Sequence, residues 1–589
     1  MRPKETWITD FRPLARDRSD IDIIPYCMNG RNGYMPRWKG YDAPAARLPS
    51  PVRGWHEIHI GFWGASAYRL RLSSDPWFTW VESTVRWDRG AKDGEEAFWK
   101  IADLTGVDFE FLPLALHAPC NSRESQIAYL RLVPLSEDKA HERVSDLRNR
   151  PTRTAGAVLD GAGDLWDYSP QSPDEVRGTI ASFIDSDFKR IHWACTCTTM
   201  RMGYLTRIGY YMGQDQDLEK MHTEGTRRGA RALLAAERGG YDPLEVLIAF
   251  ASENGLELWP SFRIQQDYAP DHPHLGYELN SPIVHAHPEW RHVDRQGKVC
   301  SFRFSHFHEG WEQYKLDLLG EIARKGPPGI HLNLMCERDA IWDFAPHAVE
   351  RFKKECGLDP CATDDPPMEW YRFRCDHLTA FMRRFRSQTN AIAKELGKPI
   401  AIAVQVSGDR HVLRGKDFGA RAVSANLIHG FDIAAWAKEG LVDVIAPSFR
   451  REYRPMFLDH LYEDLGEYRR NIELAPSLGQ YHNDVLPKDY DWSVYFTDLG
   501  AQRKDLVPFG DLDPWRILRE ANDMYQQGAD SVDVWEMGGA PNRLARWNVL
   551  KHVGDRDMLA REFGARLTGL AGKVERPVQF TEKSGQAEF

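Results

Sequence analysis

The sequence predicts an α/β protein in which a (β/α)8 TIM barrel follows an N-terminal β-sandwich or jelly roll. Two observations support this fold class. Residues 1–135 alternate apolar and polar side chains in short runs, which is typical of half-buried strands. From about residue 152 onward, apolar runs alternate with amphipathic stretches, which indicates strand and helix in turn and therefore a parallel sheet. In such a barrel the active site is expected at the C-terminal ends of the strands.

Length and composition agree with this division. The chain has 589 residues and 67.7 kDa, which is too long for one ordinary core. Hydrophobic residues make up 42% and charged residues 28%, the balance of a folded globular protein. We therefore expect an accessory β-sandwich over 1–135, a linker over 136–151 and a catalytic barrel over 152–589.

The expected strands of the N-terminal domain share period-two alternation and many aromatic residues. They are predicted at 56–64, 67–74, 77–84 and 126–135. One short helix is expected at 95–104, where EEAFWKIADL contains good helix formers. The charged stretch 136–151 is interpreted as the linker.

Eight apolar runs in the second part are predicted to be the barrel strands. They lie at 155–160, 190–196, 256–262, 329–335, 400–406, 441–447, 472–478 and 530–536. Amphipathic helices are predicted between them, for example at 174–187, 311–325 and 514–528. The segment 263–308 is long for a loop and predicts an active-site insertion. An open doubly wound sheet is the alternative, but it predicts a Gly-rich nucleotide turn, for which Gly161-Ala-Gly163 is too short.

Net charge and hydropathy limit which binding partners and which cellular compartment are expected. The formal net charge of -10 gives no electrostatic drive toward nucleic acid, and no run approaches the ~20 apolar residues of a membrane span. The N-terminal twenty residues lack the apolar segment of a secretory signal, and nine scattered cysteines predict reduced thiols. A cytoplasmic protein is expected, and a homo-oligomer is left open. The 20 Trp and 21 Tyr residues suit a carbohydrate substrate, because flat aromatic faces stack on sugar rings.

Polar and aromatic residues gather where each predicted strand ends. The residues expected to bind substrate there are His192, Arg263, Asp267, Asn333, Arg338, Gln405, Arg450, Tyr481, His482 and Trp535. Asp164, on the same side of the first strand, belongs to this group of polar strand-end residues. No Gly-x-Ser-x-Gly, Gly-x-x-x-x-Gly-Lys or His-Glu-x-x-His motif occurs, so esterase, P-loop and zincin functions lose their usual support.

Carboxyl groups at these positions point to glycoside hydrolysis, which needs one protonated and one ionised carboxyl group beside the scissile bond. Glu337 and Glu536 follow the fourth and eighth strands, which stand opposite each other in a closed eight-stranded barrel. Glu337 is the expected general acid, and Glu536 or Asp160 the expected base or nucleophile. In the alternative interpretation, Glu337 only pairs with Arg338 or Arg263 and orders the site.

Three His-x-His pairs lie in the insertion: His272/His274, His285/His287 and His306/His308. Alternate residues of a strand share a face, so one pair with a third ligand such as Asp267 would hold a metal. Histidines that contact sugar or solvent are the preferred interpretation, and no metal or cofactor is expected. A metal-dependent lyase or isomerase of a sugar-like substrate stays an alternative function. A non-catalytic carbohydrate-binding protein is another.

One short segment is similar to a known family. The run His287-Pro-Glu-Trp290, then Asp294 and Gly297, then a helix and the strand Gly329-Ile-His-Leu, resembles the glycoside-hydrolase-like family 10 barrels. The resemblance extends over about 152–560 and implies a glycoside-hydrolase type barrel. The family pattern carries an aspartate on the fourth strand where this chain has Asn333, and the acid here stands at Glu337. No catalytic aspartate is therefore carried over from the family.

Overall fold

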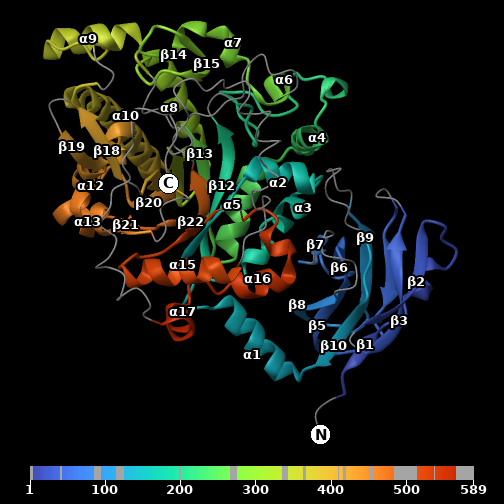
Figure 1. Cartoon of the computed structure of the whole chain (residues 1–589). Coiled ribbons are helices and arrows are strands. Elements are labelled where there is room, and N and C mark those ends of the chain that lie inside the picture. Colours follow the sequence, from blue (N-terminus) through green and yellow to red (C-terminus); the bar gives the residue numbers. More distant parts are fainter. Residues whose placement is uncertain are drawn as a thin grey trace.

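The fold is known from a computed structural model of the whole chain (Figure 1). It describes residues 4–28, 30–39, 43–84, 94–114, 125–197, 200–264, 275–334, 343–362, 366–408, 410–415, 419–450, 456–482, 514–535 and 537–564.

An eight-stranded parallel barrel forms the larger part of the molecule, as predicted. Its strands, in the order in which they pair around the barrel, are β11 (Ala155–Leu159), β12 (Phe188–Cys197), β13 (Glu257–Arg263), β16 (Gly329–Asn333), β17 (Ala401–Ser407), β20 (Val444–Arg450), β22 (Ser477–His482) and β23 (Asp533–Val534). The two-residue β21 (Glu473–Leu474) pairs beside β20. The sheet closes because β17 pairs with β20 and β23 pairs with β11. The predicted set of eight strands is confirmed. The seventh is displaced, because the predicted range 472–478 contains β21 and only the first two residues of β22.

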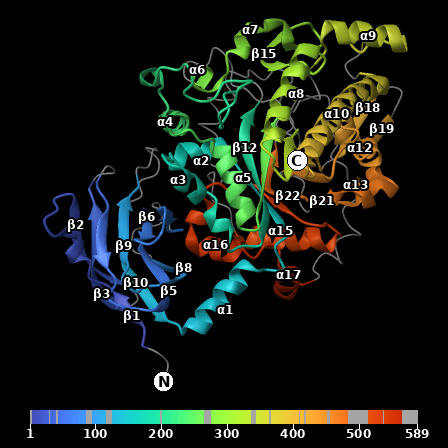
Figure 2. The same cartoon turned by 180° about the vertical axis from the view of Figure 1, so that it is seen from behind.

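Alternation within each strand divides the barrel core into two parts. On β17, Ile402, Val404 and Val406 belong to the large apolar cluster shared with the helices, while Ala403 and Gln405 point the other way, into the barrel. The helices that surround the barrel are amphipathic, as predicted. They are α2 (Gly161–Tyr168), α3 (Pro173–Gly178), α4 (Glu224–Gly239), α5 (Pro243–Glu253), α8 (Glu309–Arg324), α9 (Pro346–Cys356), α10 (Met368–Leu396), α11 (Ala425–His429), α12 (Ile433–Glu439), α13 (Asp459–Leu465), α15 (Pro514–Gln526), α16 (Leu544–Leu550) and α17 (Arg556–Phe563). Figure 2 shows α5, which packs on β13, and α8 on the rear of the barrel.

The N-terminal part consists of antiparallel sheets. One has the order β1 (Thr6–Ile8), β10 (Tyr129–Pro134), β5 (Trp55–Trp63) and β8 (Gly94–Asp103). The other has the order β4 (Ala46–Pro49), β9 (Asp108–Pro113), β6 (Ala67–Leu72) and β7 (Thr79–Glu82). Both contribute to one apolar cluster, with Ile58 and Ile60 from the first sheet and Leu70 and Phe109 from the second. The hairpin of β2 (Ile21–Met28) and β3 (Arg31–Trp38) stands beside them.

The helix expected at 95–104 is wrong, because this segment is strand β8. It pairs with β5 from Gly94 to Asp103, and that long ladder outweighs the local helix preference of EEAFWK. The expected helix at 174–187 is shorter than predicted. It ends at Gly178, and only a 3-10 turn at Ala181–Phe183 follows.

The predicted linker contains helix α1 (Glu137–Arg148). Ser136 caps its start by accepting a hydrogen bond from the Lys139 amide. Glu137 and Asp138 lie in the first turn, where their negative charges interact favourably with the positive end of the helix dipole. Ala140 is the one buried residue of this helix. The connection between the N-terminal sheets and the barrel is therefore a largely exposed helix.

The N-terminal sheets contact the barrel through the segment after β23. Arg543 donates to Glu82 of β7 over 2.6 Å, and the Asn548 side chain donates to the Phe98 carbonyl of β8 over 2.8 Å. Leu544 lies in the apolar cluster of the sheets. These contacts join the last part of the barrel to the first part of the chain.

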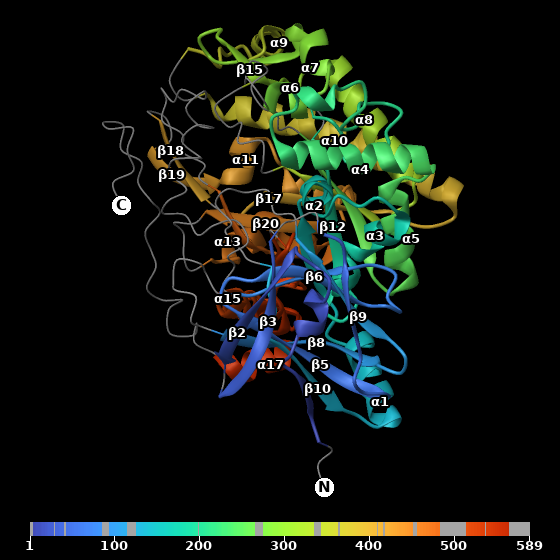
Figure 3. The same ribbon diagram turned by 90° about the vertical axis from the view of Figure 1, so that its right-hand side faces the viewer.

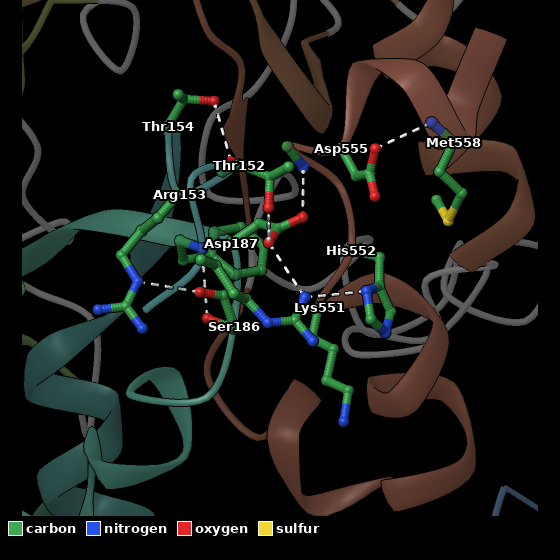
Figure 4. A network of polar contacts seen from close by, with 12 residues as sticks. Thr152, Arg153, Thr154, Ser186, Asp187, Lys551, His552, Asp555 and Met558 are labelled. Carbon is green, nitrogen blue, oxygen red and sulfur yellow. Dashed lines mark hydrogen bonds and ion pairs between the residues drawn. The ribbon is translucent and has the colours of Figure 1, made fainter. Parts of the chain in front are cut away.

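A buried polar network closes the N-terminal end of the barrel (Figure 4). Asp187, whose side chain is fully buried, accepts hydrogen bonds from Arg150, from the Thr152 hydroxyl over 2.6 Å and from the Gly554 amide. Arg150 also contacts Nδ1 of His552 over 2.9 Å. Burial, and then the charge of Arg150, lower the pKa of His552 to about 4, so this imidazole accepts from Arg150 in its neutral form. Residues before β11 are thereby tied to the last helices of the chain.

The segment after β13 is a folded insertion. It contains α6 (Leu275–Leu279), α7 (Ile283–Ala286), and a hairpin of β14 (Arg291–Val293) and β15 (Val299–Phe304). A second small hairpin, β18 (Arg410–Gly415) and β19 (Gly419–Ser424), follows β17. Figures 1 and 3 show the insertion at one end of the molecule and α1 and α17 at the other. Among the helices within the described ranges, none is long and apolar enough to cross a membrane.

Candidate active site

Two charged side chains meet at the mouth of the barrel. Asp160 directly follows β11 and stands at the N-cap position of α2, and Arg263 is the last residue of β13. Arg263 Nη2 donates to Asp160 Oδ1 over 3.0 Å. Because β12 lies between β11 and β13, the pair bridges three strand ends. The Asp160 side chain is 60% exposed, so this carboxylate is open to a ligand from solvent.

A second carboxyl group, Asp164, lies one helical turn farther along α2. It is 4% exposed, and within the described residues its Oδ2 has no hydrogen-bond partner. Burial, and then the charges of Asp167 and Asp160, raise its pKa well above the usual range. Asp164 is therefore a buried carboxyl group whose surroundings favour the neutral form, and it lies behind an exposed carboxylate.

The loop after β23 packs directly on Asp164. A Cβ at Gly538 would lie 2.8 Å from Asp164 Oδ1, so a side chain there would collide with the carboxyl group. The first and eighth strands are neighbours in the barrel, and this contact joins α2, which follows β11, to the segment after β23.

A layer of small polar side chains lies below the mouth. Asn333 and Gln405, both expected to bind substrate, have no exposed surface, and Gln405 Nε2 donates weakly to Ser477 Oγ over 3.5 Å. Ser261 Oγ is 2.8 Å from His331 Nδ1 in the same region. These groups form a polar floor inside the barrel rather than an exposed rim.

His192, another expected sugar ligand, is placed deeper in the barrel. It is fully buried, its Nε2 lies 3.4 Å from Asp533 Oδ1, and its ring is 4.6 Å from that of His331. Burial raises the pKa of Asp533, but His192 and Arg190 outweigh it and hold the pKa below the ordinary value. This arrangement gives His192 a partner within the core and no access from the mouth.

The remaining expected residues divide into three groups, according to how much of each the structure describes. Trp535 directly follows β23 and is 5% exposed, and its amide donates to the Leu478 carbonyl. Arg450, Tyr481 and His482 belong to β20 and β22, where Arg450 pairs in register with His482, but their side chains lie outside the described residues. Glu337, Glu536, Asp267 and Arg338 lie outside the described residues altogether.

Two of the histidine pairs of the insertion each contain a histidine that contacts other side chains. His287 stacks on Trp290 with ring centres 3.7 Å apart, and its Nδ1 contacts Glu289 over 2.9 Å. His306 is buried, and its Nδ1 lies 2.9 Å from Lys315 Nζ. Within the described ranges no three His, Cys, Asp or Glu side chains are placed to hold a metal ion. His272/His274 lies outside them.

The family-like segment builds the insertion. Asp294 Oδ1 accepts from the amides of Gln296 and Lys298, and Gly297 adopts a φ of 84° that favours glycine. These contacts form the turn between β14 and β15. The motif thus has a structural role in the hairpin.

One buried polar network escaped the sequence analysis. Asp343, which precedes α9, has a left-handed φ of 75° and accepts from the His306 amide over 3.1 Å. His292 Nε2 lies 3.7 Å from the same carboxyl group. The left-handed φ of Asp343 marks this place in the structure, but a φ angle cannot be read from the sequence.

No protein family and no curated protein matches this chain. Among solved structures, an α-L-fucosidase from Paenibacillus thiaminolyticus is similar at 13% identity and a TM-score of 0.39, covering 70% of this chain. This chain spans about half (50%) of that fucosidase.

Two other similar structures are a β-amylase catalytic domain from Paenibacillus polymyxa and an α-galactosidase from Thermus thermophilus. Identity is 10% for each, with TM-scores of 0.37 and 0.31. The alignments cover 70% and 92% of this chain and 97% and 95% of those chains. Because these TM-scores are below 0.5, the likenesses carry no argument about activity, which rests on the site itself.

Proposed function

We propose that the barrel hydrolyses O-glycosidic bonds of oligosaccharides with a pair of carboxyl groups. The observation that carries this proposal is the exposed Asp160 carboxylate, held by Arg263 at the mouth of a closed parallel barrel. Hydrolysis of an acetal needs an ionised carboxylate on one side of the sugar and a proton donor on the other. Asp160 supplies the first group.

The proton donor comes from the opposite side of the mouth. In the closed strand order β16 stands across from β23, and β11 is the neighbour of β23. Glu337 follows β16 in the sequence, whereas Asp160 and Glu536 follow β11 and β23. We assign Glu337 as the general acid, with Asp160 or Glu536 as base or nucleophile. Carboxyl groups on opposite sides of the barrel favour inversion, which needs room for a water molecule.

The state of Arg263 bears on the substrate class. A free arginine at the mouth would favour an anionic sugar, but Arg263 is engaged by Asp160. The opposite charges of Arg263 and Asp160 cancel, so a neutral sugar fits this site better than an anionic sugar. The finer assignment to the glycoside-hydrolase-like family 10 group belongs to this proposal and rests on the segment from His287 to Gly297.

The test is a screen of chromogenic glycosides and neutral oligosaccharides, followed by three variants on the best substrate. Asp160→Asn, Glu337→Gln and Glu536→Gln keep side-chain size and remove the acid. Removing the general acid should lower kcat by about 10²–10⁴-fold, and removing the partner carboxylate should lower it by a similar factor. Asp146→Asn, an exposed carboxylate on α1, is the matched control and should leave kcat unchanged.

The stereochemistry of the product, followed by NMR of the anomeric proton, separates inversion from retention. Three variants with parental kcat would overturn the two-carboxylate mechanism. A screen without turnover of any glycoside would overturn the function itself.

A further inference from the structure

A cavity of about 460 Å³ opens in the N-terminal part of the chain, away from the barrel mouth. Three segments line it: Thr9 and Asp10 after β1, Tyr26 in β2, and Asn32 to Tyr34 in β3. Figures 1 and 2 show β2 and β3 on the side of the N-terminal sheets that is remote from the barrel. Its volume lies within the range of small-molecule sites. The barrel mechanism makes no use of this place.

Backbone contacts hold the cavity in shape. The Tyr34 amide donates to the Thr9 carbonyl over 2.8 Å, and the Phe11 amide donates to the Tyr34 carbonyl over 3.0 Å. Gly33 allows these segments to approach, since a Cβ there would lie 2.4 Å from the Thr9 carbonyl oxygen and 2.6 Å from the Tyr26 ring. The Tyr26 hydroxyl is itself bound to the Ala128 carbonyl. The walls are therefore preorganised.

An aromatic ring and a carboxylate stand side by side in this cavity. Tyr34 is 40% exposed, although the Arg12 guanidinium lies over its ring at 4.4 Å. Arg12 also binds both oxygens of Asp10 over 2.6–3.1 Å, and this contact lowers the pKa of Asp10. Asp10 thus stays a hydrogen-bond acceptor. Arg12 already takes the position over the Tyr34 ring that the cation of a ligand would take.

The set of polar groups matches a sugar better than an ion. Asp10 and the exposed Asn32 offer carboxylate and amide groups to neighbouring hydroxyls. Tyr34 offers the part of its ring that Arg12 leaves exposed to the C–H face of a sugar ring. Asp10 is the charged residue lining the cavity, and its charge is balanced by Arg12, so the cavity offers no net charge to an ionic ligand. Arg12 does not line it.

We propose that this cavity is a second carbohydrate-binding site, which takes a neutral sugar unit of an oligosaccharide and is separate from the barrel. The site does not depend on catalysis by the barrel. It would hold a chain of sugars beside the enzyme while the mouth acts on the same or another chain.

The test uses the full chain with Asp160→Asn as background, so that the probe is not consumed. Cellohexaose, xylohexaose and maltohexaose are titrated calorimetrically. At least one should bind, and Tyr34→Ala should weaken that binding about tenfold or more, because stacking is lost. Asn32→Ala should weaken it as well. Tyr34→Phe, which keeps the ring, should retain most of the affinity.

Tyr277→Ala is the matched control, because Tyr277 is a tyrosine of similar exposure, 42%, on the insertion. It should leave binding in the N-terminal cavity unchanged. With Asp160 intact, Tyr34→Ala should leave kcat on a small chromogenic glycoside unchanged.

Three outcomes would overturn the proposal. They are no binding of any neutral hexasaccharide at millimolar concentration, equal binding by Tyr34→Ala and the background protein, or preference for an oligogalacturonate or a glucosamine oligomer. A barrel without glycosidase activity would instead leave the Tyr34-dependent binding intact, so the two proposals fail separately.

Discussion

Arg263 donates to Asp160 over 3.0 Å and so joins the ends of the first and third barrel strands. Arg263→Met should leave stability nearly unchanged, because an ion pair with a 60% exposed partner contributes only about 0–1 kcal/mol. It should lower kcat/KM about tenfold or more, because Asp160 loses the group that orients it. Thermal unfolding and kinetics on the best glycoside measure the two effects. Parental kcat/KM would mean that the pair has no part in the reaction.

A change at His192 should lower stability and leave substrate binding unchanged, which is the reverse of the effect expected for Arg263→Met. His192→Ala removes a buried partner of Asp533, which leaves a buried carboxylate with fewer compensating charges. The cost should be about 3 kcal/mol of unfolding free energy, with KM unchanged for the folded fraction. Urea unfolding and KM on the same preparation check this. A raised KM with full stability would restore His192 as a sugar ligand.

The contrast between these two residues shows what the sequence can predict. Apolar runs that alternate with amphipathic helices located all eight barrel strands, and the ends of these runs supplied the candidate site residues. The pattern does not tell how deep in the barrel a side chain lies, and this depth decides whether it can meet a substrate. Asp160 and Arg263 stand at strand ends, whereas His192 is in the middle of β12 and faces the core.

The N-terminal part was harder to predict for a different reason. The hairpin of β2 and β3 was missed because Pro25 and Pro36 interrupt its runs, and proline removes a ladder donor. The two prolines are tolerated because β2 and β3 form a two-stranded sheet, in which neither is a central strand. β8 was missed since its pairing with β5 is a long-range contact that local propensity does not contain.

Asp187 should be one of the most sensitive positions at the closed end of the barrel. Asp187→Ala leaves Arg150, Thr152 and the Gly554 amide without their acceptor, which should cost about 3–5 kcal/mol. Asp555→Ala is a graded control, because Asp555 caps α17 through a single bond to the Met558 amide and should cost about 1 kcal/mol. Equal losses in urea unfolding would contradict the network in Figure 4.

Asp164 should make stability depend on pH. Its pKa in the folded state is raised above the unfolded value of about 4, mainly by burial. The stabilising effect of its proton is fully present below pH 4 and is lost as the pH rises through the folded pKa.

Asp164→Asn mimics the protonated form, which does not lose its proton as the pH rises. Its unfolding free energy relative to the parent should therefore be more favourable at pH 8 than at pH 5. Urea unfolding at both pH values measures this difference, and Asp146→Asn, on exposed α1, should show none. Because Asp164 packs against Gly538 and is nearly inaccessible, kcat should change only a few-fold. A loss of kcat by 10²-fold or more in Asp164→Asn would instead make Asp164 the proton donor of the site and displace Glu337 from that role.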